Sequence, residues 1–555
     1  MRIKLWLLGL GLICNYGFIK AQLSENEHFE INKNIDIYNS VIKELLLNYV
    51  DTLDIKDMIQ SNIAFMLKQL DPYTEYIPED EMSDFQFQTT GEYGGIGSII
   101  SMNNNKIIIV DPYEGMPAAM AGLRPGDVLL EIDGEKMDGK STSYASDKLK
   151  GQPNTPVKIK ILRTGETKPK EITIQRKRIH IDPITYYGVL KNETGYIALS
   201  GFTTESALAV KAALNDLIAN HPIRALILDV RDNGGGVVED CLDILNLFLP
   251  KGELLLTMKG KAKVLDRTYR ATQSPLVADL PLAVLVNHNS ASASEILSGT
   301  VQDLDRGIIV GSRTFGKGLV QSSRPLPYGG RLKLTTAKYY IPSGRSIQAI
   351  DYAHRNDDGS VSHIPDSLTT VYYTSNGRPV KDGGGIFPDF VVEDEKIPTM
   401  VYYMDAQYIF FDFVVQWRAK HPQIALPSEF ILTDDIYEEF KAFVKSKDFT
   451  YDIQSEKVMR TLKNIMEFEG YMKTASEEFQ AIEKIVKPNL DRDLNLHKDS
   501  IAKYLAMQIM KQYYYAKGEL IYELREDPVL NKALEILSDK ELYENTLRAS
   551  LSETP

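Results

Sequence analysis

Three serines follow a short apolar run in the segment Asn287 to Glu295, which reads NHNSASASE. The run before it, 282–286, is bounded by a proline and is typical of a buried strand of a parallel sheet. Residues 295–301 have apolar side chains at helical spacing, so the serines lie in a strand-to-helix turn. A hydroxyl there lies beside the free N–H groups and the positive end of a helix dipole, where an oxyanion is stabilised. The alternative is an ordinary serine-rich helix cap.

A single lysine lies in the nearby segment 311–321, which reads GSRTFGKGLVQ. Lys317 is flanked by two glycines and follows a phenylalanine, a poor setting for a solvated surface charge. A serine hydroxyl is a weak nucleophile at neutral pH and needs a base within hydrogen-bonding reach. A lysine amine can be that base if burial lowers its pKa well below about 10.4 and so keeps it neutral. The two segments therefore indicate serine chemistry assisted by a lysine.

Together the two segments resemble the C-terminal processing, or tail-specific, peptidases, which are serine peptidases of the serine/lysine-dyad type. The resemblance implies that Ser292, between two alanines, is the nucleophile, that Lys317 is its base and that Gln321 orients the lysine. It also implies an oxyanion hole made of N–H groups of Gly235 and Ala293. A strand continuing from the lysine would place positions 317, 319 and 321 on one face, which is compatible with these roles.

Other candidate side chains leave alternatives open. Glu295 and Asp303 match acidic positions of the family pattern, and either a supporting role or an ordinary place on a helix face or in a loop fits them. His288 lies four residues before Ser292, but no aspartate pattern places an orienting carboxylate behind it, so we expect it to be structural. Cys241 falls in an apolar helical pattern, so we expect a buried thiol rather than a nucleophile.

A PDZ domain is predicted over about residues 91–175. The segment Gly94, Gly95, Ile96 and Gly97 resembles the carboxylate-binding loop of PDZ domains, whose backbone N–H groups hold the C-terminal carboxylate of a peptide. The longer stretch 117–134, PAAMAGLRPGDVLLEIDG, carries the resemblance further. Upstream, residues 70–74 read LDPYT and resemble the turn that precedes the PDZ domain in the processing peptidases.

Two glycine-rich segments suggest phosphate binding as an alternative. Residues 231–236, RDNGGG, follow a buried strand, but they resemble the DLRxNPGG segment of the peptidases, with Gly234 where the proline usually stands. Residues 311–318 fall one residue short of a P-loop, because Gly318 has no hydroxyl for a magnesium ion and the chain continues as a strand. We therefore prefer the peptidase interpretation for both segments.

The composition indicates a large exported globular protein. The chain has 555 residues, of which 43% are hydrophobic and 25% charged. Residues 1–21 have a basic start, an apolar stretch and Ala21 before Gln22, which is typical of a secretory signal peptide. A lipid anchor at Cys14 is the weaker alternative, because Ile13 stands where a lipoprotein signal expects a small residue. Without residues 1–21 the net charge is −16 and one cysteine remains, which argues against nucleic acid as a partner and excludes an internal disulfide.

These patterns predict an α/β multidomain protein. The expected order is a signal peptide (1–21), an N-terminal helical region (22–84), a PDZ domain (85–176), a serine peptidase core (177–399) and a C-terminal helical domain (400–555). The resemblance implies a crotonase-like α/β core with the PDZ domain inserted, and it implies no metal or organic cofactor. The C-terminal helices are expected to pack on the core, on another subunit or on an adaptor.

The expected function is that of an exported, most simply periplasmic, serine endopeptidase. Its substrates would be polypeptides recognised partly by their C-terminal tails and cleaved through an acyl-enzyme. Two alternatives are a non-catalytic PDZ scaffold or chaperone and a hydrolase whose base is His288. The intact set of Ser292, Lys317 and Gln321 argues against a scaffold. If the enzyme remains active after substitution of His288, the histidine-based alternative is excluded.

Overall fold

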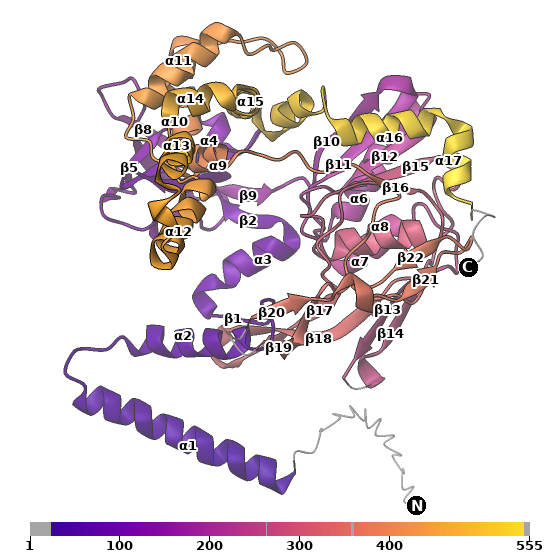
Figure 1. Ribbon diagram of the computed structural model, residues 1–555. Helices are drawn as coiled ribbons and strands as arrows, with labels where there is room; N and C mark the ends of the chain where they lie inside the picture. The colour runs from indigo at the N-terminus through magenta and orange to yellow at the C-terminus, as the bar shows by residue number, and fades with distance from the viewer. Residues whose placement is uncertain (1–23, 262, 357–359, 549–555) are drawn as a thin grey trace, which may run out of the picture. The chain divides into compact units, whose positions relative to one another are not determined.

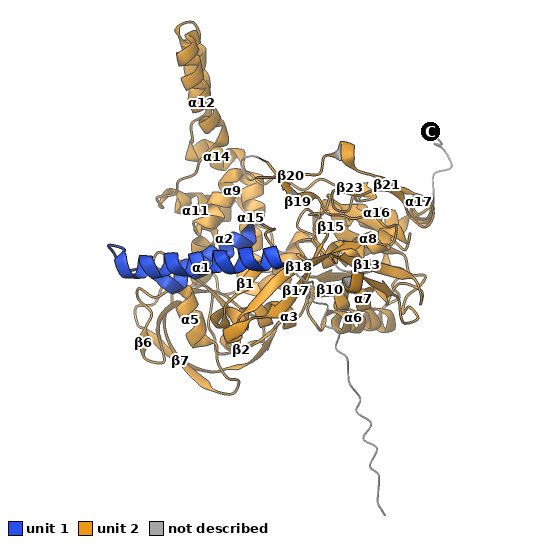
Figure 2. Cartoon of the chain, turned by 90° about the horizontal axis from the view of Figure 1, so that it is seen from below, with its two compact units in different colours: residues 1–69 blue, residues 70–555 orange. Residues whose placement is uncertain are grey.

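The computed structural model describes residues 24–261, 263–356 and 360–548 (Figure 1). The predicted signal peptide and Cys14 lie outside the described residues. The chain divides into two units, residues 1–69 and 70–555 (Figure 2). In the first unit, helices α1 (Glu25–Asn48) and α2 (Ile55–Lys68) confirm the predicted helical pattern. Ser24 and Asp54 cap these helices by accepting hydrogen bonds from main-chain N–H groups of the first turn.

A six-stranded sheet organises the second unit. Its strands follow the order β10 (Ile184–Leu190), β11 (Thr194–Leu199), β12 (Ala225–Asp229), β15 (Leu282–Val286), β16 (Ile308–Gly311) and β23 (Phe390–Val391). β10 is antiparallel to β11, and the other neighbours are parallel. Helices follow three of the strands in the chain: α6 (Ser206–Asn220), α7 (Val238–Leu245) and α8 (Ala293–Asp303). The strand-to-helix turn predicted around the serines is thus confirmed.

The apolar strands of this sheet are buried on both faces, and successive residues point to opposite faces. Leu226, Leu228 and Val284 belong to the core that includes α6, α7 and α8. Ile227 and Leu285 point the other way, into a core shared with α16 (Pro528–Ser538) and α17 (Lys540–Thr546). The last two helices of the C-terminal region therefore cover the second face of the sheet (Figure 1).

A second, antiparallel sheet carries the segment after Lys317. β18 (Arg331–Tyr340) pairs with β1 (Glu75–Ile77), β13 (Leu254–Gly260) and β17 (Leu319–Pro325), and β13 also pairs with β14 (Arg267–Arg270). Two short pairs follow: β19 (Ile350–Arg355) with β20 (Val361–His363), and β21 (Val371–Tyr373) with β22 (Pro379–Lys381). Because β17 begins at Leu319, Lys317 lies in the loop before the strand, not at the start of the strand as expected.

The predicted PDZ region forms its own antiparallel sheet. β3 (Ser98–Asn103), β4 (Lys106–Pro112), β5 (Val128–Ile132), β7 (Pro156–Leu162) and β8 (Lys170–Gln175) pair in this order, with β6 (Glu135–Lys136) on β5. Helices α4 (Pro117–Met120) and α5 (Thr142–Leu149) contribute Ala118 and Leu149 to its hydrophobic core. β2 (Glu92–Gly95), which follows α3 (Met82–Thr90), pairs with β9 (Lys177–His180) and so closes the two ends of this region together.

Five of the remaining C-terminal helices share a separate hydrophobic core: α9 (Thr399–Ala406), α10 (Ile409–Lys420), α11 (Asp434–Lys445), α14 (Leu490–Leu496) and α15 (Lys498–Glu523). Helices α12 (Gln454–Glu469) and α13 (Ser476–Val486) contribute no described residue to this core. Phe410 and Phe440 stack in this core with ring centroids 5.2 Å apart. Within the described residues, no helix has both the length and the apolar character needed to cross a membrane.

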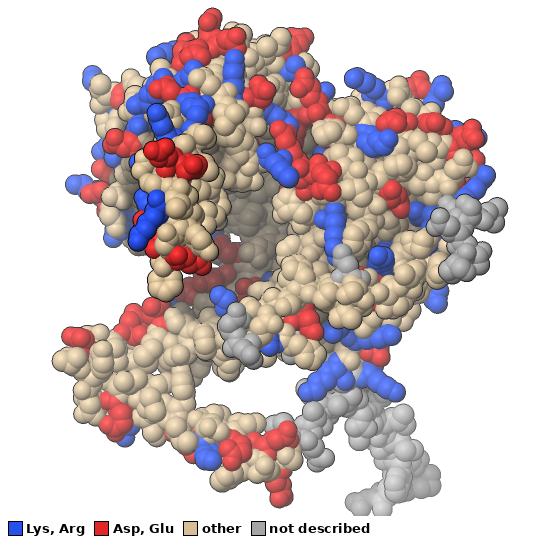
Figure 3. Space-filling model, in the orientation of Figure 1, with Lys and Arg blue, Asp and Glu red and all other residues tan. Residues whose placement is uncertain are grey.

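Charged side chains of both signs are interspersed on the surface shown in Figure 3. Many of them form exposed ion pairs, such as Lys498 with Asp434 at 2.8 Å and Lys532 with Glu535 at 3.0 Å. Exposed pairs of this kind contribute about 0–1 kcal/mol each. The fold therefore depends on its buried cores rather than on surface charge.

Leu530 on α16 provides a test of the packing on the sheet. It is 3% exposed and lies in the core shared with β12, β15 and β16. Leu530→Ala should lower the free energy of unfolding by about 2–5 kcal/mol, because it leaves a cavity in that core. Chemical denaturation followed by circular dichroism measures the change. Leu208→Ala on α6, where the side chain is 70% exposed, is the control and should change stability by less than about 0.5 kcal/mol. Equal losses would contradict the described packing.

Candidate active site

Ser292 lies between β15 and α8 with a strained main chain. Its φ is 57° and its ψ is −112°, a region that side-chain-bearing residues rarely adopt and that costs about 1–3 kcal/mol. The flanking residues Ala291, Ala293 and Ser294 are buried, whereas Ser292 is half-buried. The turn therefore leaves Ser292 as the accessible serine of the segment.

The hydroxyls of the two neighbouring serines are used for hydrogen bonds within the fold. Ser290 Oγ donates to the carbonyl of Val230 at 2.7 Å, and Ser294 Oγ donates to the carbonyl of Asn233 at 2.7 Å. Ser292 Oγ faces the main-chain N–H of Glu295 in a capping box, but its hydroxyl proton has no acceptor within the described residues. The family resemblance singled out Ser292 among the three serines, and this difference in hydrogen bonding favours the same residue.

Glu295 is fully buried and joins the serine turn to the lysine loop. Its Oε2 accepts the N–H of Ser292 at 2.8 Å and the N–H of Lys317 at 2.9 Å. Its Oε1 accepts the N–H of Gly316 at 2.7 Å and the hydroxyl of Thr314 at 2.6 Å. Burial raises the pKa of this carboxyl, and the four hydrogen bonds oppose that shift. Of the two functions left open for Glu295, the geometry favours a supporting one.

Tyr339 on β18 binds the main-chain carbonyl groups of the same two residues, Ser292 and Lys317. Its hydroxyl lies 3.2 Å from the carbonyl oxygen of Ser292 and also hydrogen-bonds the carbonyl oxygen of Lys317. The ring is 1% exposed and belongs to the core under the sheet. Glu295 and Tyr339 thus bind the N–H and C=O groups of both Ser292 and Lys317, which brings together residues 25 positions apart in the sequence.

The amine of Lys317 is largely removed from water. Burial, with a smaller contribution from the charge of Lys333, lowers its pKa to about 8. The carboxylates of Glu295, Asp71 and Glu75 act in the opposite direction but do not cancel the effect of burial. The amine also lies 4.4 Å from the centroid of the Tyr73 ring. This environment fits the requirement, derived from the sequence, that the lysine lose its proton near neutral pH.

Gln321 does not hydrogen-bond Lys317 in this structure. Its side-chain amide donates instead to Thr335 Oγ1 at 3.1 Å, and Thr335 Oγ1 is also 3.3 Å from the hydroxyl of Thr74. The pairing of β17 with β18 is irregular between Val320 and Gln321, which a simple alternation of side chains did not anticipate. Gln321 therefore lies near the lysine loop but is held by β18.

The predicted oxyanion hole is supported for one of its two N–H groups. Ala293 begins α8, and within the described residues its N–H has no acceptor. Gly235 lies against the serine, since a Cβ added to it would be 2.8 Å from the Cβ of Ser292. The N–H of Gly235, however, donates to Asn233 Oδ1 at 2.9 Å, so this donor is occupied. Its φ of +98° and its close contacts explain why a glycine stands there.

Asp303 takes part in a buried ion pair away from the serine turn. It lies at the far end of α8, where it contacts Arg345 at 2.8 Å with both side chains fully buried. Its second oxygen accepts the N–H of Ser343 at 2.9 Å. Such a pair fixes the loop after β18 to α8, and of the ordinary structural alternatives for Asp303 the place on a helix is the one observed.

The structure corrects one expectation about His288 and supports another about Cys241. A carboxylate does lie behind His288, because Asp394 Oδ2 is 2.7 Å from His288 Nδ1, 106 positions away in the sequence. His288 lines a cavity of about 790 Å³ bordered by acidic side chains of the C-terminal helices, and Ser292 does not line that cavity. Cys241 is buried, with its thiol 3.2 Å from the carbonyl of Ala293, and burial raises the pKa of the thiol. It is a structural thiol.

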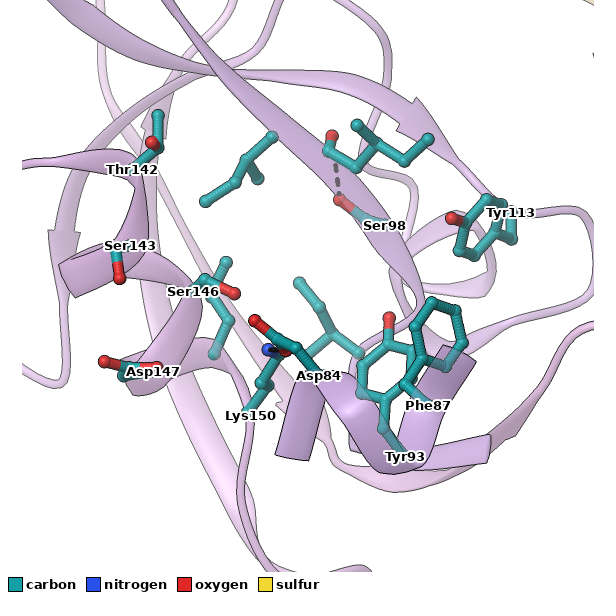
Figure 4. A pocket seen from close by; sticks show the side chains of 14 residues that line it. Asp84, Phe87, Tyr93, Ser98, Tyr113, Thr142, Ser143, Ser146, Asp147 and Lys150 are labelled. Carbon is teal, nitrogen blue, oxygen red and sulfur yellow. Dashed lines mark hydrogen bonds and ion pairs between the residues drawn. The ribbon is translucent and has the colours of Figure 1, made fainter. Parts of the chain in front are cut away.

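The predicted carboxylate-binding loop lies at a groove between β3 and α5 (Figure 4). The groove has a volume of about 390 Å³, and its apolar walls include Ile96, Ile100 and Leu149. β3 is at the edge of its sheet, so its outer side is open to another strand. Tyr93 lines the same groove, and the backbone N–H groups of Gly97 and Ser98 lie close enough to its hydroxyl to partly offset the effect of burial on its pKa.

The other three loop residues are held by the fold. Gly94 and Gly95 belong to β2 and pair with Arg178 and Lys177, and Ile96 is 3% exposed. A side chain at Gly94 would collide with the main chain of residue 151. The structure therefore places Ile96 of the loop on the lining of the groove, with the N–H groups of Gly97 and Ser98 near the Tyr93 hydroxyl.

Comparison with known proteins agrees with this geometry. Residues 193–353 match the model described as "Peptidase family S41", residues 108–163 match "PDZ domain", and residues 400–537 match "Probable PDZ-protease, C-terminal helical domain". A carboxy-terminal-processing protease of Bartonella bacilliformis is 34% identical over 352 residues, which cover 63% of this chain and 80% of the relative. This chain belongs to the carboxy-terminal-processing proteases of peptidase family S41. The predicted family and its PDZ domain are thereby confirmed.

Two further relatives of this S41 peptidase are a bacterial sequence and a solved structure. A Staphylococcus aureus protein named "Probable CtpA-like serine protease" is 30% identical over 360 residues, covering 62% of this chain and 71% of the relative. The structure of the photosystem II D1 C-terminal processing protease is 26% identical, covers 64% of this chain and 87% of its own, and has a TM-score of 0.35. The predicted fold class, an α/β peptidase with PDZ and C-terminal helical domains, is confirmed together with the family.

Tyr73 and Tyr339 are the residues of the site that the sequence did not single out. Tyr73 lies in the segment 70–74, which carried the family resemblance, so its position was marked but its contacts were not. Their partners are distant in the sequence, and only the folded chain brings the Tyr73 ring to Lys317 and the Tyr339 hydroxyl to Ser292.

Tyr339→Phe tests whether the two main chains must be held together. Loss of the hydroxyl leaves the carbonyl of Lys317 without this donor, so kcat should fall about tenfold with little change in KM. Steady-state kinetics on a peptide substrate measure both constants. Tyr437→Phe is the matched control, because its hydroxyl also donates to a main-chain carbonyl, that of Leu494 at 2.6 Å, among the C-terminal helices. An equal loss of kcat in the control would show that the effect is not specific to the contacts of Tyr339 with Ser292 and Lys317.

Proposed function

We propose that this S41 peptidase is an exported endopeptidase in which Ser292 is the nucleophile and Lys317 is the general base. The main support is the joint contact of Glu295 and Tyr339 with the main chains of both residues. The available hydroxyl of Ser292 and the buried amine of Lys317 add to it. The basic start and apolar stretch of residues 1–21 support export.

In the proposed reaction, the neutral amine of Lys317 accepts the proton of the Ser292 hydroxyl while Oγ attacks the carbonyl carbon of the scissile bond. The carbonyl π electrons move onto oxygen, and the N–H of Ala293 stabilises this charge at the N-terminus of α8. The Lys317 ammonium then protonates the departing amine as the C–N bond breaks, leaving an acyl-enzyme. Water attacks the ester carbonyl while the Lys317 amine takes its proton, and the Lys317 ammonium returns that proton to Ser292 Oγ as the C–O bond breaks and the carboxylic acid leaves.

Gly235 and Gln321 have roles in this scheme that require a small rearrangement. Gly235 becomes the second oxyanion donor when its N–H is released from Asn233 Oδ1. Gln321 orients the lysine when its amide exchanges Thr335 for the amine. Hydrogen bonds of this kind are often completed only when substrate is bound. Binding of a substrate carbonyl next to Ser292 would supply the new acceptor.

The scheme sets a direction for the pH dependence. Only the deprotonated amine of Lys317 accepts a proton, so activity should rise as the pH increases through the pKa of that amine, about 8. At pH 7 about one tenth of the molecules would have the amine in its active form. Guanidinium cannot lose its proton in this range, so an arginine cannot replace the lysine.

The dyad is tested by digestion of an unfolded protein substrate. Ser292→Ala, Lys317→Ala and Lys317→Arg should each lower turnover by about 10³-fold or more with unchanged circular dichroism, because the two residues act as a unit. Ser290→Ala and Ser294→Ala should have milder effects, and His288→Ala should leave turnover near that of the wild type. Near-normal turnover in Ser292→Ala or Lys317→Ala would exclude the dyad. A large loss in His288→Ala alone would favour a histidine-based hydrolase.

We also propose that the groove between β3 and α5 binds the C-terminal tails of substrates. An extended tail can pair with the open edge of β3 while its last side chain enters the apolar part of the groove. Its carboxylate would then displace the Tyr93 hydroxyl at the N–H groups of Gly97 and Ser98. Main-chain pairing depends little on sequence, so recognition should be broad, with an apolar last residue preferred.

Tail recognition predicts a difference between free-acid and amidated peptides of the same sequence. The amidated form should be cleaved more slowly, by about tenfold, because it lacks the charge that the loop N–H groups bind. Ser146→Phe on α5 should fill the groove and abolish this difference. Lys148→Phe, on the same helix but outside the groove lining, should preserve it. Equal rates for both peptide forms in the wild type would exclude recognition of the tail carboxylate while leaving the dyad untouched.

A further inference from the structure

We propose that Tyr73 is a positioning residue of the peptidase reaction, whose ring covers the amine of Lys317 and keeps water away from it. The proposal rests on the proposed role of Lys317 as the base. Tyr73 would then determine at which pH the lysine can act, although the tyrosine itself takes no part in bond making or breaking.

The position of the Tyr73 ring over the lysine is fixed by its own turn. The carboxylate of Asp71 accepts the N–H of Tyr73 at 2.8 Å and the N–H of Thr74 at 2.8 Å, and it also accepts the Thr74 hydroxyl at 3.1 Å. Asp71 and Thr74 are themselves buried. A side-chain carboxylate that binds the N–H groups two and three residues on locks a turn of this kind. The ring centroid is 4.4 Å from Lys317 Nζ.

The turn is attached to the sheet that carries the lysine loop. Thr74 Oγ1 accepts the N–H of Thr335 at 3.2 Å, and the next residues form β1, which pairs with β18. On the other side, the Tyr73 hydroxyl lies 3.3 Å from the hydroxyl of Tyr352, and the two rings meet edge to face with centroids 5.9 Å apart. The ring is therefore anchored through its main chain, its neighbour and its hydroxyl.

Cover by an aromatic ring has two opposing electrostatic effects on an amine. The face of the ring attracts the ammonium form, whereas exclusion of water disfavours it. The charged groups around Lys317 are Lys333 on β18, Glu295 on α8, Glu75 on β1 and Asp71 in the turn. Three of these four favour the ammonium, yet the pKa of the amine is lowered, so exclusion of water dominates. Removing the ring should therefore raise that pKa.

The pH profile of kcat/KM for the full chain is the primary test. In Tyr73→Ala the midpoint of the profile should move from about 8 toward the ordinary lysine value of about 10.4, so that activity falls about tenfold or more at pH 7.5 and recovers at high pH. Tyr73→Phe keeps the ring and should keep the midpoint. Tyr76→Ala, a neighbouring tyrosine on β1, is the matched control and should leave the midpoint unchanged.

A pH-independent loss in Tyr73→Ala, with the midpoint unmoved, would overturn the proposal. If Tyr73→Ala does not fold, Tyr73→Gln keeps the bulk but places a polar group on the amine, and it should raise the midpoint likewise. NMR titration of ¹³C-methylated lysines in Ser292→Ala reports the amine directly, with Lys317→Arg assigning the signal. If Tyr73→Ala shifts this signal but not the activity profile, Tyr73 covers the amine and Lys317 is not the base. If neither the NMR signal nor the activity profile shifts, Tyr73 does not shield the Lys317 amine from water.

Discussion

A buried carboxylate, that of Glu295, determines the geometry on which the rest of the site depends. A carboxylate has about four positions for hydrogen-bond donors, and each is occupied here by a donor from the serine turn or the lysine loop. Burying such a group without partners would cost several kcal/mol. Because the two segments satisfy it jointly, neither can move away without leaving a buried charge short of donors. The same contacts hold the main chain of Ser292 in its strained conformation. Without them, the segment would relax to a more favourable conformation.

The sheet explains why these segments meet. β12 and β15 are parallel neighbours, so the loops at their carboxyl ends lie side by side. Those loops are the glycine-rich segment and the serine turn. They are joined by hydrogen bonds from Ala291 N–H to the Asn233 carbonyl at 3.1 Å and from Asp232 N–H to Asn287 Oδ1 at 3.0 Å. Topology thus brings the loops together, and polar contacts then fix their spacing.

The sequence was informative where the relevant interactions are local. The apolar run 282–286 and the helical spacing after it were enough to place Ser292 at a turn, because strand and helix have different periods. The burial of Glu295 and its contacts with both segments could not be predicted in this way, since an exposed carboxylate on a helix and a buried one look alike in a sequence. The same holds for Asp394 behind His288, Arg345 beside Asp303 and the irregular pairing at Gln321, all of which depend on residues distant in the chain. The family resemblance marked positions but not these partners.

Helices α16 and α17 have a consequence for how this peptidase is made. The strands that carry the serine turn are complete by residue 311, but the second face of their sheet is covered only by residues 528–546. During synthesis, Ile227 and Leu285 therefore remain without the helices that cover them until more than two hundred further residues have been added. Until that point the nascent chain presents an open hydrophobic sheet surface, of the kind that chaperones bind. A protease assembled in this order stays without a finished core while it is still being translated.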